Sequence, residues 1–173
     1  MVKIYKFEGH SNYRKYQPEI RELVLSASND SELRFYFAIN EAVCNAARYA
    51  RAGHRNAPIC IKLKLEPYAM SAIIIGETVS FDANGYLGKM QELAAGKYKD
   101  MDWGDYTHDS IGGRGFFYML EACDFVTISS DGNIVTLHTP LPIDTEMRSR
   151  TKIWQLVSRL RVSDIGQIGA MVT

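Results

Sequence analysis

Two segments of the chain alternate apolar and polar residues with the period of a β-strand. They are residues 2–8 and residues 59–65, and in the second the apolar side chains occupy every other position. Pro67 follows the second segment, and a short apolar run comes next at residues 72–75. A strand, a turn residue and a second, more buried strand in this order predict a β-hairpin.

Four further segments are predicted as helices: residues 13–27, which carry apolar residues at helical spacing, and residues 30–51, 87–95 and 116–123. Pro18 is compatible with a helix only in its first turn, so the first helix is expected to begin near Gln17. Asn29 and Glu32 have the spacing of a capping box, which predicts the start of the second helix. Gly53 follows that helix as a common C-terminal signal.

A second hairpin is predicted late in the chain, where strands at residues 125–129 and 134–139 flank Asp131-Gly132. Before it, residues 97–110 are polar and aromatic without a period, which predicts a long loop that is either functional or mobile. Two hairpins with interspersed helices predict an α+β fold. The expected form is a two-layer α/β sandwich, in which helices cover one face of a mixed, mostly antiparallel sheet.

Composition narrows the classes of function. The 173 residues suffice for one ordinary domain, and 46% of them are hydrophobic. Twenty basic and twenty acidic side chains give no net charge, which argues against a nucleic-acid-binding protein. The apolar runs are far too short to span a bilayer, and the first ten residues lack the apolar segment of a signal peptide. We therefore expect neither direct nucleic-acid binding nor membrane association.

The cysteines and histidines are scattered. Cys44, Cys60 and Cys123 are odd in number and form no Cys-x-x-Cys pair, so we expect reduced thiols in a cytoplasmic protein. None of the four histidines has a metal-binding spacing to a cysteine or to another histidine, and no zinc site is expected.

Polar residues interrupt the apolar surface of the helix predicted at residues 30–51. Glu41, Asn45 and Arg48 are four and three residues apart, so they lie on one face of that helix. One interpretation is that they face solvent or cap a neighbouring loop. The other is a site, because a carboxylate and an amide can hold a hydrated magnesium ion and accept a proton from an attacking hydroxyl.

A glycine cluster, IGGRGFF at residues 111–117, precedes the helix predicted at residues 116–123. Glycines before a helix allow backbone N–H groups to approach an anion, and Arg114 adds a guanidinium suited to phosphate. The alternative is an ordinary glycine-rich turn.

The order of these features resembles the GHKL (Bergerat-fold) ATPase family, closest to the anti-sigma-factor serine/threonine kinases of partner-switching pathways. Three stretches carry the resemblance, which covers about residues 2–141. NEAVCNAARYA resembles the family's N box, GGRGFFYMLEACDFV its second glycine box with the following helix, and DGNIVTLHTPL its closing hairpin. The resemblance implies the Bergerat type of α/β sandwich, with ATP and Mg²⁺ as ligands.

The resemblance also implies roles at the matching positions. Glu41 would be the general base, and Asn45 would hold magnesium against the ATP phosphates. The phosphate lid would contain Gly113, Arg114 and Gly115. The remaining implied nucleotide contacts are Arg48, Tyr49, Gly76, Asp82, Phe116 and Thr136. Thr136 would lie near the pocket for the nucleotide base, although a threonine in a strand equally often faces solvent or packs against its neighbours.

One part of the family pattern is altered. The first glycine box reads D-x-G-x-G in the family, and its aspartate recognises the adenine amino group. In the preferred register Gly76 takes the place of that aspartate, while Thr78 and Ser80 replace the glycines. Glu77, one residue out of register, and Asp82, well beyond the strand, are the other candidates. Loss of this carboxylate predicts weakened, altered or absent nucleotide binding.

The residues after Pro142 lie beyond the resemblance. Ile153, Leu156, Val157 and Leu160 form an apolar stripe at helical spacing, and the segment is basic. We expect a domain at residues 1–142 and a basic amphipathic helical extension at residues 143–173. That helix either packs on its own domain or docks an acidic partner or a second copy of the chain.

Two functional hypotheses follow. In the first, the chain is an ATP-binding, anti-sigma-factor-like protein that phosphorylates a small antagonist protein on serine or threonine. In the second, it is a degenerate Bergerat-fold module that sequesters a protein partner without ATP chemistry. The intact N box and second glycine box favour the first, and the altered first glycine box favours the second. A sigma factor, an antagonist protein or both are the partners expected.

Overall fold

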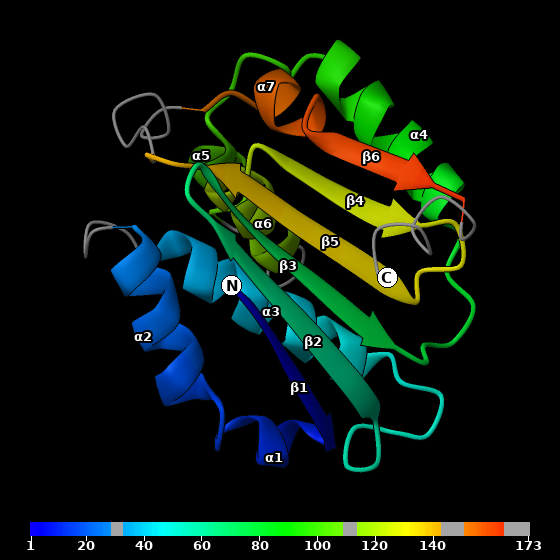
Figure 1. The fold of residues 1–173 in the computed structure, drawn as a ribbon. Helices are drawn as coiled ribbons and strands as arrows, with labels where there is room; N and C mark the ends of the chain where they lie inside the picture. The colour runs from blue at the N-terminus through cyan, green and yellow to red at the C-terminus, as the bar shows by residue number, and fades with distance from the viewer. Residues whose placement is uncertain (29–32, 109–113, 143–150, 165–173) are drawn as a thin grey trace.

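Six strands form a single mixed sheet in the computed structural model (Figure 1), which describes residues 1–28, 33–108, 114–142 and 151–164. The strands are β1 (Val2–Glu8), β2 (Pro58–Glu66), β3 (Ala69–Gly76), β4 (Phe125–Ser129), β5 (Ile134–Pro140) and β6 (Leu160–Ser163). Their order across the sheet is β1-β2-β3-β5-β4-β6. All neighbouring pairs are antiparallel except β4 and β6, which are parallel.

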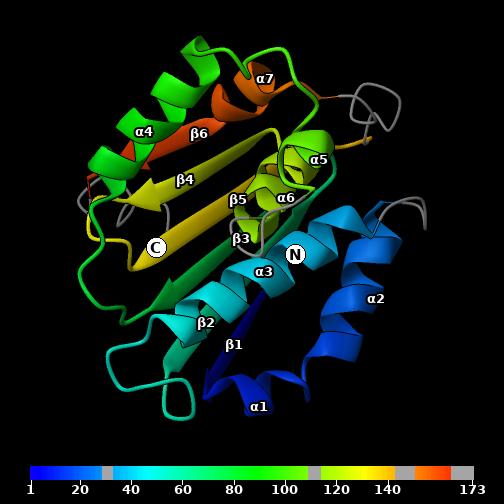
Figure 2. The ribbon, with the colours of Figure 1, turned by 180° about the vertical axis from the view of Figure 1, so that it is seen from behind.

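Helices cover one face of this sheet. They are α1 (His10–Tyr13), α2 (Gln17–Ala27), α3 (Arg34–Arg48), α4 (Ala83–Ala95), α5 (Trp103–Tyr106), α6 (Arg114–Ala122) and α7 (Ile153–Val157). Figures 1 and 2, seen from opposite sides, show α3, α4 and α6 on the same side of the strands. Among the described residues the opposite face carries no helix, and the predicted α+β class with a mixed sheet is confirmed.

Both predicted hairpins are confirmed. In β2 the side chains of Ile59, Ile61, Leu63 and Leu65 are buried toward the helices while the intervening residues are not, as the alternation predicted. β2 pairs with β3, and β4 pairs with β5, in antiparallel register. Gly132 in the second turn has a φ of 77°, a left-handed conformation that favours glycine and explains the turn signal.

α3 is the central helix of the covered face. Its core side includes small residues at intervals of four, Ala38, Ala42 and Ala46, which allow the helix to approach the sheet closely. A Cβ added at Gly76 at the end of β3 would lie 3.2 Å from the Cβ of Ala46, so the two backbones are nearly in contact. α3 therefore fixes its polar residues at a short distance above β3.

The ends of the first helices follow two different signals. α2 begins at Gln17 and has Pro18 in its first turn, as predicted. α3 begins at Arg34, later than the predicted residue 30, and the capping-box residues Asn29 and Glu32 lie outside the described residues. It ends at Arg48, before the predicted end, because the next residues pair with the segment after β3. Arg51 N donates to Glu77 O at 2.8 Å, and Val79 N donates to Tyr49 O at 2.8 Å.

The segment predicted as an irregular loop contains the short helix α5. The Asp102 side chain accepts a hydrogen bond of 2.8 Å from Gly104 N and so caps this helix. The ring of Trp103 stacks on Phe117 of α6, with centroids 6.4 Å apart. The loop prediction was therefore wrong for this turn, since a local cap and aromatic packing order it. Residues 109–110 lie outside the described part.

The structure corrects the predicted C-terminal helical extension within residues 151–164; the rest of the predicted segment, residues 143–150 and 165–173, lies outside the described residues. α7 is short and buries Ile153, Leu156 and Val157, but Leu160 belongs to strand β6, which pairs with β4. The apolar stripe has helical spacing, yet the last of its residues is buried by a strand partner distant in sequence. Arg159, between α7 and β6, donates to the carbonyl oxygen of Leu120 at 2.9 Å and binds the end of α6.

Candidate functional site

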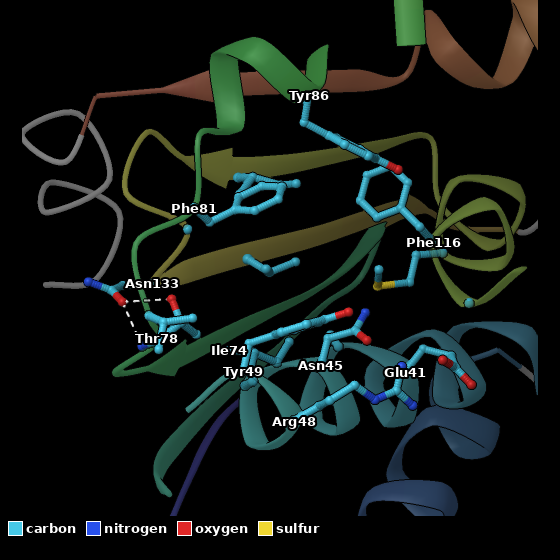
Figure 3. Close-up of a pocket in the computed structure, with 18 of the residues that line it drawn as sticks. Glu41, Asn45, Arg48, Tyr49, Ile74, Thr78, Phe81, Tyr86, Phe116 and Asn133 are labelled. Atoms are coloured by element: carbon cyan, nitrogen blue, oxygen red, sulfur yellow. Dashed lines mark hydrogen bonds between the residues drawn. The ribbon is translucent and has the colours of Figure 1, made fainter. Parts of the chain in front are cut away.

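A cavity of about 440 Å³ lies between α3, the sheet, α6 and the segment that joins β3 to α4 (Figure 3). Its volume falls within the range of small-molecule sites. The lining residues are Glu41, Ala42, Asn45, Ala46, Arg48, Tyr49, Ile74, Thr78, Val79, Ser80, Phe81, Tyr86, Gly115, Phe116, Met119, Ile128, Gly132, Asn133 and Val135.

The polar side of the cavity comes from α3. Glu41, Asn45 and Arg48 all line it, as their spacing on one helix face predicted. Glu41 and Asn45 are half-buried, and within the described ranges neither side chain makes a hydrogen bond or an ion pair. A carboxylate and an amide without partners are therefore available to a ligand.

Gly115, in the first turn of α6, lies against Glu41. A Cβ at this position would overlap the carboxylate of Glu41, so no larger residue fits while Glu41 keeps its conformation. Gly115 of the predicted second glycine box is thus in contact with the predicted general base Glu41, although the two are more than seventy residues apart.

Apolar side chains form the floor of the cavity and the wall opposite it. Ile74, Val135 and Ile128 lie opposite one another on β3, β5 and β4, and this row forms the floor. Phe81, Tyr86 and Phe116 form the opposite wall. The ring of Tyr86 lies 5.0 Å from that of Phe116, nearly perpendicular to it, and 5.7 Å from that of Phe81. A slot with these walls suits a flat, apolar or aromatic group.

The hydroxyl of Tyr86 stays protonated over the physiological range. Burial raises its pKa to about 12, and the nearby Tyr49 hydroxyl adds to the effect. Tyr86 therefore offers the cavity a neutral aromatic ring and not a phenolate.

The far end of the cavity holds a polar group that the sequence patterns did not indicate. Thr78 donates from its backbone N–H and from its hydroxyl to the Oδ1 of Asn133, at 2.9 and 3.0 Å. Asn133 in turn donates from Nδ2 to Asp131 at 2.7 Å. Figure 3 shows Thr78 and Asn133 on one side of the cavity and Glu41 on the other.

The predicted site residues fall into two groups. The residues that line the cavity are Glu41, Asn45, Arg48, Tyr49, Gly115 and Phe116; those described residues that do not are Gly76, Asp82, Arg114 and Thr136. Gly113 lies outside the described residues.

Two of the residues outside the cavity come from the altered first glycine box. Gly76 is buried against Ala46 and contributes no surface to the cavity. Asp82 is exposed, and its carboxylate caps α4 by accepting a hydrogen bond of 2.9 Å from Gly85 N. Neither position 76 nor position 82 thus supplies a carboxylate to the cavity, and the carboxylate of Asp82 caps α4 instead.

Arg114 and Thr136 do not line the cavity, each for a different reason. The guanidinium of Arg114 donates to the backbone carbonyl oxygens of Thr107 and His108, which ties the start of α6 to the end of α5. Thr136 lies on the opposite face of the sheet, because adjacent strand residues alternate, and its neighbour Val135 faces the cavity instead. The prediction that Thr136 contacts the ligand was therefore wrong by one position along β5.

Cys44 lies on α3 beside the polar residues. Its Sγ is 3.2 Å from the Nε2 of His10. Burial raises the pKa of the thiol, and the Glu41 carboxylate raises it further, while Arg48 acts in the opposite direction. The thiol is held in its protonated form, so Glu41 is the stronger candidate for a proton acceptor at this site.

No set of three His, Cys, Asp or Glu side chains in the described ranges could hold a metal ion by itself. A magnesium ion bound mainly by phosphate and water, with one protein oxygen, is compatible with the amide of Asn45, which no described residue pairs.

A scan against protein-family models finds none that matches the chain, and a search of the curated proteins finds no match either. None of the described helices combines the length and apolar character that a bilayer crossing requires.

Proposed function

We propose that the cavity binds the magnesium complex of a nucleoside triphosphate, with the phosphates at Glu41, Asn45 and Arg48. One observation carries the proposal: Glu41 and Asn45 of α3, whose side chains have no hydrogen-bond partner among the described residues, line a slot with aromatic and aliphatic walls, and the first turn of α6 lies against Glu41. Charged groups at one end and flat apolar walls at the other match the two halves of a nucleotide. On this proposal the sheet and its helices form a sandwich of the Bergerat type.

The chemistry we propose is transfer of the terminal phosphoryl group to a serine or threonine. Glu41 would accept the hydroxyl proton of the acceptor residue. Arg48 would contribute positive charge near the phosphates, and Asn45 would hold the magnesium ion through its amide oxygen. Bound magnesium neutralises phosphate charge, and positioning with charge neutralisation is most of what this reaction needs.

The proposed acceptor is a small antagonist protein of a partner-switching pathway, and the chain would act in the cytoplasm as an anti-sigma-factor-like regulator. A sigma factor is the second proposed partner, and a second copy of the chain is a third. These assignments rest on the resemblance of the three sequence stretches.

A second function is favoured by the absence of a second carboxylate among the described residues that line the cavity. A cavity without the adenine-recognising aspartate suits a module that sequesters a protein partner and transfers no phosphate. The two functions differ in whether Mg-ATP binds.

Calorimetric titration with Mg-ATP tests the proposal. The wild-type protein and Glu41→Gln should both bind, whereas Asn45→Ala should bind at least about tenfold more weakly, the effect of losing roughly 1.4 kcal/mol. Thr136→Val is the matched control, because the Thr136 hydroxyl is buried on the other face without a hydrogen-bond partner among described residues.

Transfer is then measured with γ-labelled ATP and a candidate antagonist protein. Glu41→Gln should abolish labelling while ATP binding persists. An absence of ATP binding at millimolar nucleotide would eliminate the kinase and leave the sequestering module.

A further inference from the structure

The far end of the cavity contains a chain of hydrogen bonds that joins four residues. Thr78 donates to Asn133, and Asn133 donates to Asp131. Ser129 also donates to Asp131, from its hydroxyl at 2.6 Å, so the carboxylate accepts from both sides. Thr78 and Asn133 line the cavity, whereas Asp131 and Ser129 lie behind them.

The orientation of the Asn133 amide follows from its partners. The backbone N–H of Thr78 can only donate, so the atom facing it at 2.9 Å must be the carbonyl oxygen Oδ1. An ionised carboxylate can only accept, so the atom facing Asp131 must be the nitrogen Nδ2. Rotation of the amide by 180° would place Nδ2 against the N–H of Thr78, two donors, and Oδ1 against the carboxylate of Asp131, two acceptors.

Asp131 is ionised at neutral pH. Burial acts to raise its pKa, but hydrogen bonds from Ser129 and Asn133 outweigh burial, and the net shift lowers the pKa. The carboxylate therefore remains an acceptor and keeps the amide of Asn133 in this orientation.

The hydroxyl of Thr78 is left with a single role toward a ligand. Its proton is committed to Oδ1 of Asn133, which cannot donate in return, at 3.0 Å. Thr78 is only 7% exposed, so little water competes for the hydroxyl. What the hydroxyl presents to the cavity is a lone pair, and in Figure 3 the amide nitrogen of Asn133 points away from the cavity.

We infer that the hydroxyl of Thr78 acts toward the nucleotide base only as a hydrogen-bond acceptor. Thr78 thereby selects a 6-aminopurine over a 6-oxopurine. Asn133 and Asp131 are positioning residues, because they act by holding the hydroxyl of Thr78 in the accepting orientation. The inference rests on the proposed nucleotide site. It assigns to Thr78 the amino-group recognition that no carboxylate at position 76 supplies.

The selectivity has a direct physical cause. An exocyclic amino group donates to the lone pair of Thr78, whereas a carbonyl oxygen would face that lone pair as a second acceptor. A site built around a hydrogen bond rejects an analogue that cannot form it.

The test compares ATP with inosine triphosphate, which carries a carbonyl oxygen in place of the 6-amino group, by calorimetry. Wild-type protein should bind ATP at least about tenfold more tightly, the ratio that corresponds to a difference of roughly 1.4 kcal/mol. Thr78→Val keeps the shape and removes the acceptor, so the ratio should fall to near one through loss of ATP affinity. Thr78→Ser keeps the hydroxyl and should keep the ratio.

Asn133→Ala separates positioning from structural support. Without Oδ1, the hydroxyl of Thr78 is free to rotate and to donate to a carbonyl oxygen. The ratio of ATP affinity to inosine triphosphate affinity should fall toward one, and the variant should bind inosine triphosphate at least as tightly as the wild type does. A merely structural role would weaken both nucleotides equally and leave the ratio unchanged, and that result would overturn the role of Asn133.

Three outcomes are distinct. A wild-type ratio near one, with both nucleotides bound, would overturn the inference and leave the proposed function standing. A ratio retained in Thr78→Val would also overturn it. Binding of neither nucleotide would refute the proposed function and the inference together. Thermal melting checks that each variant is folded, and Asn133→Ala carries the test if Thr78→Val does not fold.

Discussion

Replacement of Gly115 by alanine tests the contact on which the proposed site depends. A methyl group at this position would overlap the carboxylate of Glu41. The obstructing atoms are at the end of a flexible side chain, so Glu41 can turn aside, at a cost of about 0.5–1.5 kcal/mol for an unfavourable rotamer. Alanine in a helix gains about 0.5–1 kcal/mol over glycine. The two effects nearly cancel in the wild-type background.

A double-mutant cycle exposes the cancellation. In a Glu41→Ala background the obstruction is gone, so Gly115→Ala should stabilise the protein by the helix gain alone. The expected coupling free energy between the two sites is about 0.5–1.5 kcal/mol. Gly88→Ala in α4 is the control: apart from its chain neighbours and the backbone of its own helix, no described heavy atom lies within 4 Å of its added Cβ, so the same stabilisation is expected in both backgrounds.

The assay is urea unfolding followed by circular dichroism, with the free energy of unfolding taken from the midpoint and slope of each transition. A coupling below about 0.3 kcal/mol between Gly115 and Glu41 is within additivity error, and it would show that the carboxylate does not lie against α6. The single variant has a functional consequence too: a displaced Glu41 should abolish phosphoryl transfer as fully as Glu41→Gln does.

Two further predictions concern residues outside the cavity. Arg159→Gln should lower the free energy of unfolding by about 1.5–3 kcal/mol, since its charged hydrogen bond to Leu120 O binds the end of α6. Arg161→Gln, which loses a cation–π contact with the Phe125 ring, should cost less than about 1 kcal/mol. Burial raises the pKa of Glu121 above its ordinary 4.5, so the native state binds the carboxyl proton more tightly than the unfolded state does. The contribution of Glu121 to stability therefore falls as pH rises through the window above 4.5. Urea unfolding of Glu121→Gln should therefore show a gain over wild type that grows across this window, and a difference independent of pH would contradict the argument.

Several elements were predictable from local pattern alone. β1 was expected at residues 2–8 and has those bounds, because alternation needs no information beyond the strand itself. α2 begins at Gln17, where the ring of Pro18 can be accommodated. The turn at Gly132 was predictable because few residues other than glycine adopt its left-handed backbone conformation.

The candidate site was predictable in part. Helical spacing was enough to place Glu41, Asn45 and Arg48 on one face, and they line one cavity. Thr136 was misplaced because a strand's pattern of residues does not reveal which face a polar position occupies when both faces are partly buried. Asp82 was a candidate for the base pocket, yet its cap on α4 satisfies the carboxylate locally.

Taken alone, the sequence determined the elements whose signals are local: the alternating strands, the proline-marked helix start, the glycine turn and the polar face of α3. The tertiary structure decided the rest. Leu160 became part of a strand because β4 offers a parallel partner more than thirty residues away in the chain. Thr78 gained a fixed acceptor role because folding places it against Asn133, 55 residues distant. Such pairings depend on which segments the fold brings together, and no periodicity within one segment encodes them.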